Sequence, residues 1–239
     1  SAPRKRTRYA LRDITFTVPQ GKTVAIVGRM GAGKSTLVNL LPRLFDVSAG
    51  TITIDSRDIR SFTLAELRQY IGYVPQDPFL FSTRISDNIA FSQENVELDA
   101  IRRAAPLANV AEEIQEFPRA YDTVSGERGI TLSGGQKQRL TLSRALLPDT
   151  PIVILDDALS SVDMETERNI LQALRNSTTE KTVLVISHRV SAVRDADFIV
   201  VLENGEIAEM GTHSQLVELN GVYTELFQYQ ALEEELAQL

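Results

Sequence analysis

The chain has 239 residues, a formal net charge of −7 and no cysteine. This length can bury a substantial core in one large domain or two small lobes. The acidic charge argues against a nucleic-acid partner, and the lack of cysteine excludes disulfides and thiolate metal sites. No apolar run approaches the ~20 residues of a membrane-spanning helix, and residues 1–6 lack the apolar core of a signal peptide. We therefore expect a soluble, cytosolic chain.

The first half begins as an α/β protein. Residues 1–10 carry four basic side chains without periodicity, which is typical of a solvated arm. Residues 11–18 alternate apolar and polar side chains and predict a strand, which the turn 19–22 connects to the apolar strand 24–27.

A glycine-rich loop follows this second strand, and a helical spacing of apolar residues begins directly after it. The loop matches G-x-x-x-x-G-K-[ST] in the strand–loop–helix context that makes this pattern a P-loop. Its backbone N–H groups would hold a polyphosphate, Lys34 would reach the β- and γ-phosphates, and the Ser35 hydroxyl would ligate Mg²⁺. An ordinary glycine-rich turn is disfavoured because every motif position is filled. The candidate nucleotide-binding residues are Gly28, Arg29, Met30, Gly31, Ala32, Gly33, Lys34, Ser35 and Thr36.

Beyond the P-loop the pattern predicts strands at 51–55 and 70–76 with a short helix between them at 64–67. From residue 79 to 124 short helical segments dominate, separated by Pro106 and Pro118. We interpret this stretch as a helical subdomain inserted into the α/β core.

The second half returns to α/β alternation. A helix opens at Gly134 and Gly135, and the apolar strand 151–156, typical of the interior of a parallel sheet, ends in Asp156. An amphipathic helix at 164–175, strands at 182–187 and 196–202, an Asn204-Gly205 hairpin and a helical tail at 222–239 follow.

Residues 132–139 read Leu-Ser-Gly-Gly-Gln-Lys-Gln-Arg, about a hundred positions after the P-loop and shortly before the strand that ends in aspartate. With these three elements in order, the chain closely resembles the nucleotide-binding domain of ATP-binding cassette (ABC) transporters. The resemblance covers nearly the whole sequence. It implies a P-loop NTPase fold of the RecA-like type, α/β with a parallel-sheet core, an antiparallel β subdomain and an inserted α-helical subdomain. We expect the core at 1–78 and 150–239, and the helical subdomain with the signature motif at 79–149.

The resemblance also implies roles for single residues. Gln76 is placed as the glutamine that touches Mg²⁺ and senses the transmembrane domain, Asp156 as a ligand of Mg²⁺, and His188 as the switch histidine near the γ-phosphate. Residues 160–163 resemble the D-loop that communicates between two paired domains. In such head-to-tail pairs the signature loop completes the ATP site of the other chain, here through Ser133, Gly134, Gly135 and Gln136. His213 lies in a shared structural turn and receives no chemical role.

The sequence departs from the family pattern at Asp157, where hydrolysis-competent domains carry a glutamate that polarises the attacking water. Aspartate is shorter by roughly 1.5 Å of reach, and such a misplacement can cost ~10²-fold in rate. A tolerated substitution is the alternative. We favour a slow site in one half of a heterodimeric, multidrug-type exporter, whose partner chain carries the glutamate.

A second departure concerns the aromatic residue that stacks on adenine in this family, about 25 positions before the first P-loop glycine. That count reaches Ala2 and Pro3, which cannot stack, and Tyr9 is the nearby aromatic residue. We expect that Ser1 and Ala2 are a cloning remnant and that the first strand was cut away; alternatively, Tyr9 takes the role.

Residues 121–129 resemble the exporter-specific X-loop that meets the coupling helices of the transmembrane domain, with Glu127 as a candidate contact, and residues 205–213 also match exporter domains. The resemblance implies an ATP-hydrolysing domain, with ATP and Mg²⁺, at the cytoplasmic face of a membrane. It drives export by ATP-dependent dimerisation with a second such domain, and nucleic acid is not a partner. Two alternatives stay open: a non-transport ABC ATPase, and a regulatory subunit that holds ATP without turnover.

Overall fold

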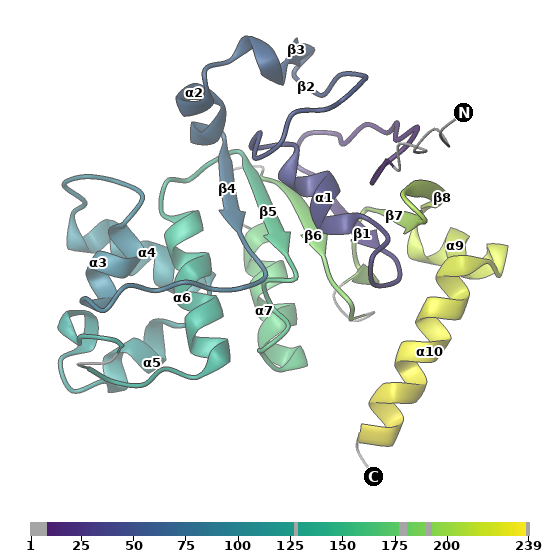
Figure 1. Cartoon of the computed structure of the whole chain (residues 1–239). Coiled ribbons are helices and arrows are strands. Elements are labelled where there is room, and N and C mark those ends of the chain that lie inside the picture. The colour runs from purple at the N-terminus through teal and green to yellow at the C-terminus, as the bar shows by residue number, and fades with distance from the viewer. Residues whose placement is uncertain (1–8, 127–128, 177–180, 190–192, 238–239) are drawn as a thin grey trace, which may run out of the picture.

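The computed structural model describes residues 9–126, 129–176, 181–189 and 193–237. Its centre is a six-stranded sheet in the order β4-β5-β6-β1-β7-β8 (Figure 1). All neighbouring strands pair in parallel except β7 and β8. The mainly parallel α/β fold predicted from the sequence is thus confirmed. The strands are β1 (Thr23–Val27), β4 (Ile71–Val74), β5 (Ile152–Asp156), β6 (Thr182–Ile186), β7 (Phe198–Glu203) and β8 (Glu206–Gly211).

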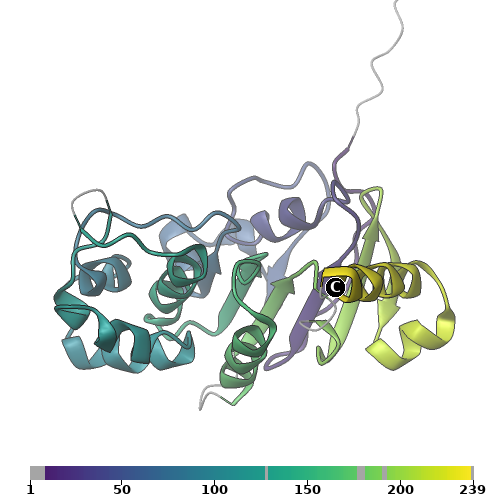
Figure 2. The ribbon, with the colours of Figure 1, turned by 90° about the horizontal axis from the view of Figure 1, so that it is seen from below.

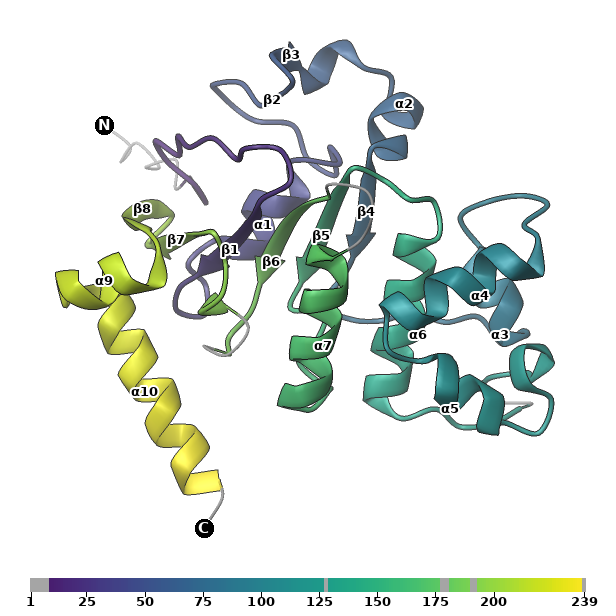
Figure 3. The same cartoon turned by 180° about the vertical axis from the view of Figure 1, so that it is seen from behind.

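Helices cover both faces of this sheet. Helix α1 (Lys34–Asn39) lies on one face and α7 (Met164–Arg175) on the other, as Figures 1 and 3 show from opposite sides. Within β5, Ile154 packs into the core on the α1 side, whereas Val153 and Leu155 pack into the core on the α7 side. Because both faces are buried, the strand needs apolar residues at every position, which explains its uninterrupted apolar run.

Further helices gather at the two ends of the sheet (Figure 2). Beyond β4 lie α3 (Ile85–Ala90), α4 (Leu98–Leu107), α5 (Ala111–Glu116) and α6 (Gly134–Leu146), with the 3₁₀ turn η2 (Ala120–Asp122). At the other end lie α9 (His213–Leu219) and α10 (Val222–Ala237). The assignment of residues 79–149 to a separate subdomain stays a prediction.

One helix boundary differs from expectation. Pro106 does not separate two helical segments but lies inside α4, one residue before its end. A proline in the last turn removes a single backbone hydrogen bond, so the helix accommodates it and stops directly afterwards.

A second, small sheet is antiparallel throughout. Strands β2 (Thr53–Ile54) and β3 (Arg57–Asp58) form a two-stranded ribbon, followed by the 3₁₀ turn η1 (Ile59–Ser61) and α2 (Leu64–Gln69). The strand predicted at residues 11–18 was wrong. Among the residues that the structure describes, this segment pairs with no strand, and its alternating side chains Ile14, Phe16 and Val18 pack partly buried on the core. One-sided burial therefore produces the alternation without a strand ladder.

The parallel register brings four strand ends to one edge of the sheet. Ile186, the last residue of β6, is paired with Ile26 of β1 and Asp156 of β5, and Val74 of β4 is paired with Leu155. Ligands of parallel α/β sheets bind beyond the carboxyl ends of the strands. This edge therefore carries the candidate site.

No helix in the described ranges is both long enough and apolar enough to cross a membrane.

The turn between β7 and β8 anchors the segment that precedes the core. Asn204 (φ 52°) and Gly205 (φ 82°) are both left-handed, as the tight Asn-Gly hairpin requires. The Gly205 carbonyl accepts a hydrogen bond from the Arg12 N–H at 2.8 Å. A Cβ atom on Gly205 would lie 2.5 Å from the Ala10 carbonyl oxygen.

We predict that Gly205→Ala destabilises the fold more than Gly50→Ala. Gly50 has nearly the same φ of 83°, but a Cβ there would meet nothing within 4 Å. Both changes carry the ~1–2 kcal/mol of a left-handed alanine, and only Gly205→Ala adds an overpacking cost of ~1–3 kcal/mol. Urea unfolding of the two variants measures the difference. Equal losses would show that the packing of Ala10 on the hairpin is unimportant.

Candidate functional site

The P-loop leaves β1 at Gly28 and enters α1 through Gly33, which caps the helix in a left-handed conformation with a φ of 101°. The Lys34 side chain is buried beneath this loop. Its ammonium donates hydrogen bonds to the backbone carbonyls of Gly28 at 2.7 Å and Arg29 at 3.1 Å. Burial lowers the pKa of Lys34, and the carboxylates of Asp157 and Asp156 oppose that shift. The lysine is thus held where the loop would enclose an anion.

Two P-loop side chains point away from this centre. The Met30 side chain is almost fully exposed, and the Arg29 guanidinium lies 3.4 Å from the Glu225 carboxylate of α10. These positions can therefore offer a ligand their backbone N–H groups rather than their side chains.

Ser35 and Asp156 meet although they lie far apart in the sequence. The Ser35 hydroxyl donates to Asp156 Oδ1 at 2.8 Å. The second carboxylate oxygen of Asp156 lies 3.1 Å from the Tyr73 hydroxyl, which is also 2.7 Å from Asn39 Oδ1. Hydroxyl and carboxylate oxygens are the ligands that Mg²⁺ prefers. Of the three ligands proposed for the metal, Ser35 and Asp156 therefore lie side by side with oxygen donors that fit this ion, whereas Gln76 contacts another side chain.

Gln76 and Asp157 form the next pair. The Gln76 amide nitrogen donates to Asp157 Oδ2 at 3.4 Å, so the contact of Gln76 in this structure is with the carboxylate proposed for catalysis. Asp157 is left-handed with a φ of 49°, and its N–H donates to the Ile186 carbonyl at 3.0 Å. Burial raises the pKa of Asp157, opposed first by the charge of His188. His188 itself is exposed, directly beyond β6.

The signature residues lie away from the P-loop, at the start of α6. Ser133 caps α6, its hydroxyl accepts from the Gln136 N–H at 3.2 Å, and the Gln136 side chain accepts from the Ser133 N–H at 2.9 Å. Helix α6 packs against α3, α4 and β4, three places along the sheet from β1. In the described part of the chain, no hydrogen bond connects Ser133, Gly134, Gly135 or Gln136 with the P-loop.

Tyr9 is exposed, and its neighbours rather than its ring lie against the P-loop. A Cβ atom on Gly33 would lie 2.7 Å from the Leu11 side chain and 3.2 Å from the Ala10 carbonyl oxygen. The backbone next to Tyr9 thus touches the start of α1. Glu127 lies outside the described residues, so its proposed contact with coupling helices stays a prediction.

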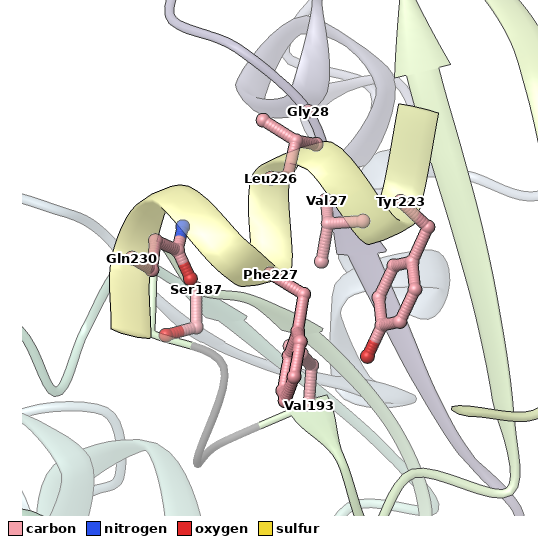
Figure 4. A pocket seen from close by; sticks show the side chains of 8 residues that line it. All are labelled: Val27, Gly28, Ser187, Val193, Tyr223, Leu226, Phe227 and Gln230. Atoms are coloured by element: carbon pink, nitrogen blue, oxygen red, sulfur yellow. The ribbon is translucent and has the colours of Figure 1, made fainter. Parts of the chain in front are cut away.

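Helix α10 lies beside Gly28 at the start of the P-loop. A small pocket lies between α10 and the ends of β1 and β6 (Figure 4). Gly28 and Ser187 contribute from the site edge, whereas Tyr223, Leu226, Phe227 and Gln230 project from α10. His213, for which the sequence predicts no chemical role, is hydrogen-bonded to the Tyr223 hydroxyl at 2.8 Å and helps to fix this helix.

Several site residues were missed by the sequence reasoning. Tyr73 and Asn39 support Asp156, and Gln138 and Arg189 contact the segment after Asp157. Tyr73 could have been identified, because parallel pairing of the strands at 70–76 and 151–156 places it beside the residues before Asp156. The other three contacts join loops and helices whose relative positions no local pattern specifies.

We predict that Ser35→Ala weakens ATP binding only when Mg²⁺ is present. The hydroxyl is a proposed metal ligand, and loss of a metal-site partner typically costs ~10–100-fold in affinity. Isothermal titration with ATP in Mg²⁺ and in EDTA separates the two contributions. Ser48→Ala, in the loop before β2, is the matched control. An equal loss in EDTA would contradict a metal role for Ser35.

Tyr73→Phe removes the hydroxyl beside Asp156 and Asn39 while it keeps the ring. We expect an Mg²⁺-dependent ATP affinity that is lower by about 10-fold or more, since a hydrogen bond to a charged group contributes ~1.5–3 kcal/mol. The thermal unfolding midpoint in the absence of nucleotide should change little, because the half-buried ring keeps its packing. An unchanged affinity would show that Asp156 needs no support from Tyr73.

Comparison with known proteins agrees with this geometry. Residues 11–160 match the family model described as ABC transporter. The chain is 47% identical over 222 residues to the ATP-dependent lipid A-core flippase of Methylococcus capsulatus, a match that covers 92% of this chain and 37% of the flippase. It is also 46% identical over 224 residues to the human mitochondrial potassium channel ATP-binding subunit, and this match covers 93% of this chain and 30% of the subunit.

A solved structure of a bacterial Atm1-family ABC exporter with ATP bound superimposes with a TM-score of 0.90 at 42% identity. It covers 95% of this chain and 40% of the exporter chain. The chain thus spans about two-fifths or less of the length of these relatives. A family match over more than half of the chain, together with this fold, establishes that the chain belongs to the ABC transporter family.

Proposed function

We propose that this chain is the ATP-binding and ATP-hydrolysing domain of an ABC exporter, located at the cytoplasmic face of a membrane. The observation that carries the proposal is the hydrogen bond between Ser35 and Asp156, which brings the P-loop and the end of β5 together beside the buried Lys34. Among the relatives are a lipid flippase and an exporter solved with ATP bound. These similarities favour transport over a non-transport ABC ATPase.

Each site residue would have a role that follows from its position. The P-loop N–H groups and Lys34 would bind the phosphates, and Ser35 and Asp156 would hold Mg²⁺, which supplies charge neutralisation on the phosphate oxygens. Asp157 would orient the attacking water, and the hydrogen bond from Gln76 holds its carboxylate at this edge of the sheet. His188, directly beyond β6, would face the γ-phosphate. Tyr9 is proposed to contact the base, since the adjacent backbone touches the start of α1.

Pairing with a second domain is supported by the distance between the two motifs. The signature residues lie on α6 beyond β4, whereas the P-loop follows β1. Ser133 can therefore reach an ATP molecule on another chain rather than the one on its own P-loop. We propose a head-to-tail pair, and because Asp157 replaces the glutamate of active sites, a heterodimer whose partner carries that glutamate.

A transmembrane partner is supported by an exposed aromatic cluster near α3. Phe79 and Phe91 are each more than 60% exposed, and Phe81 lies between them with ring centroids at 4.9 and 4.3 Å. The Arg144 guanidinium lies 5.6 Å from the Phe91 ring and 5.9 Å from the Phe81 ring. A contiguous exposed aromatic surface is typical of an interaction site. We infer that the coupling helices of the transmembrane domain dock here.

The length of the carboxylate at position 157 decides between a slow enzyme and a regulatory subunit without turnover. We predict that Asp157→Glu raises the steady-state rate of phosphate release at saturating MgATP by ~10–100-fold, because the longer side chain restores the position of the base. ATP affinity should stay within about twofold. Asp157→Asn is the control and should abolish turnover.

Two other results would contradict a slow enzyme. If the wild-type chain alone already hydrolyses ATP as fast as Asp157→Glu, the site is not slow and the heterodimer hypothesis loses its basis. If neither variant nor wild type turns over although all bind ATP, the chain is a regulatory ATP-holding subunit.

A further inference from the structure

The segment between Asp157 and α7 is held from two sides by side chains of distant elements. It contains Ser160, Ser161 and Val162, and it joins the end of β5 to α7. The Ser160 hydroxyl also donates to the Asp157 carbonyl at 3.0 Å, so a displacement of the segment acts on the backbone of Asp157. We refer to residues 160–162 as the linking segment.

The first side is formed by α6, the helix that begins at the signature motif. The Gln138 side chain is only 2% exposed, its amide nitrogen donates to Ser160 Oγ at 3.1 Å, and its carbonyl oxygen accepts from the Ser161 N–H at 2.8 Å. A Cβ atom on Gly135 would lie 2.9 Å from the Ser161 carbonyl oxygen. The backbone of α6 therefore packs directly on the backbone of the linking segment, and Gln138 fixes this contact with two hydrogen bonds.

The second side is formed by Arg189, the residue after His188. Its guanidinium donates to the carbonyls of Ser160, at 2.8 Å, and Val162, and also to Glu167 of α7 at 3.3 Å. The Glu167 side chain is 3% exposed. A buried carboxylate requires a compensating charge, so Arg189 cannot leave this position without exposing or neutralising Glu167. The guanidinium is thus anchored while it holds two carbonyls of the linking segment.

We propose that Gln138 and Arg189 are positioning residues that clamp the linking segment between them. The clamp connects the helix of Ser133, which would act on the ATP of a partner chain, with the loop of His188, which would act on the chain's own ATP. Because the Ser160 hydroxyl donates to the Asp157 carbonyl, the clamp would also fix the backbone that carries the Asp157 carboxylate. This effect on hydrolysis rests on the function proposed above, whereas the clamp itself rests on the contacts alone.

Hydrogen–deuterium exchange of the nucleotide-free chain tests the clamp without any need for activity. Arg189→Lys keeps the charge beside Glu167 but replaces two separate donor nitrogens, one for the Ser160 carbonyl and one for the Val162 carbonyl, with a single ammonium. Gln138→Leu removes the partner of the Ser161 N–H. Each variant should accelerate exchange in the peptide that covers residues 160–162 by ~10-fold, as expected for the loss of about one net hydrogen bond.

Arg43→Lys is the matched control. Arg43 likewise joins a carboxylate, Asp46 at 3.0 Å, to a backbone carbonyl, that of Phe62 at 3.3 Å, but it lies away from the linking segment. This variant should leave the exchange of residues 160–162 unchanged. Wild-type exchange in both Arg189→Lys and Gln138→Leu would overturn the clamp.

Kinetics then test what the clamp does. Both variants should lower kcat for ATP hydrolysis by ~10-fold or more while the Kd for MgATP stays within about twofold, because neither side chain contacts the P-loop. A Kd that rises as much as kcat falls would overturn a positioning role. A wild-type chain that does not bind ATP would instead overturn the proposed function and leave the exchange test standing.

Discussion

The structure depends on parallel strands that end at the same level. Because β1, β5 and β6 finish side by side, Ser35 of the P-loop and Asp156 of β5 form a hydrogen bond of 2.8 Å although 121 positions separate them. Apolar residues on both faces of these strands fix the sheet between two helical layers, and this packing positions the polar strand ends. The site is therefore a consequence of the core.

The division between the P-loop and the signature motif follows from the same sheet. Helix α6 packs beyond β4 at one end, and the P-loop follows β1 in the other half. Under the head-to-tail pairing proposed above, the P-loop of one chain and the signature motif of the other would together enclose one nucleotide. The contacts of Gln138 and Arg189 with residues 160–162 span part of the interval between those surfaces.

Local patterns predicted the parts of the fold in which one segment determines its own structure. The apolar runs, the Asn204-Gly205 hairpin and the helix from Met164 to Arg175 are of this kind, and the predicted bounds of that helix agree with the structure. The strand predicted at residues 11–18 failed because alternation reports one-sided burial and not backbone pairing. At the site, the motif residues came from spacing and resemblance, whereas the supporting contact of Tyr73 and the clamp of Arg189 depend on how separate segments pack in three dimensions.

The central claim is that Ser35 and Asp156 form a metal site that works together with nucleotide. Electron paramagnetic resonance of Mn²⁺ in place of Mg²⁺ measures this directly, since bound and free Mn²⁺ give distinct signals. We predict that the chain binds about one Mn²⁺ when ATP is present, that binding without ATP is far weaker, and that Asp156→Asn weakens the ATP-dependent binding by ~10-fold or more. Equal Mn²⁺ binding with and without ATP, or an Asp156→Asn variant that binds as the wild type does, would contradict the account.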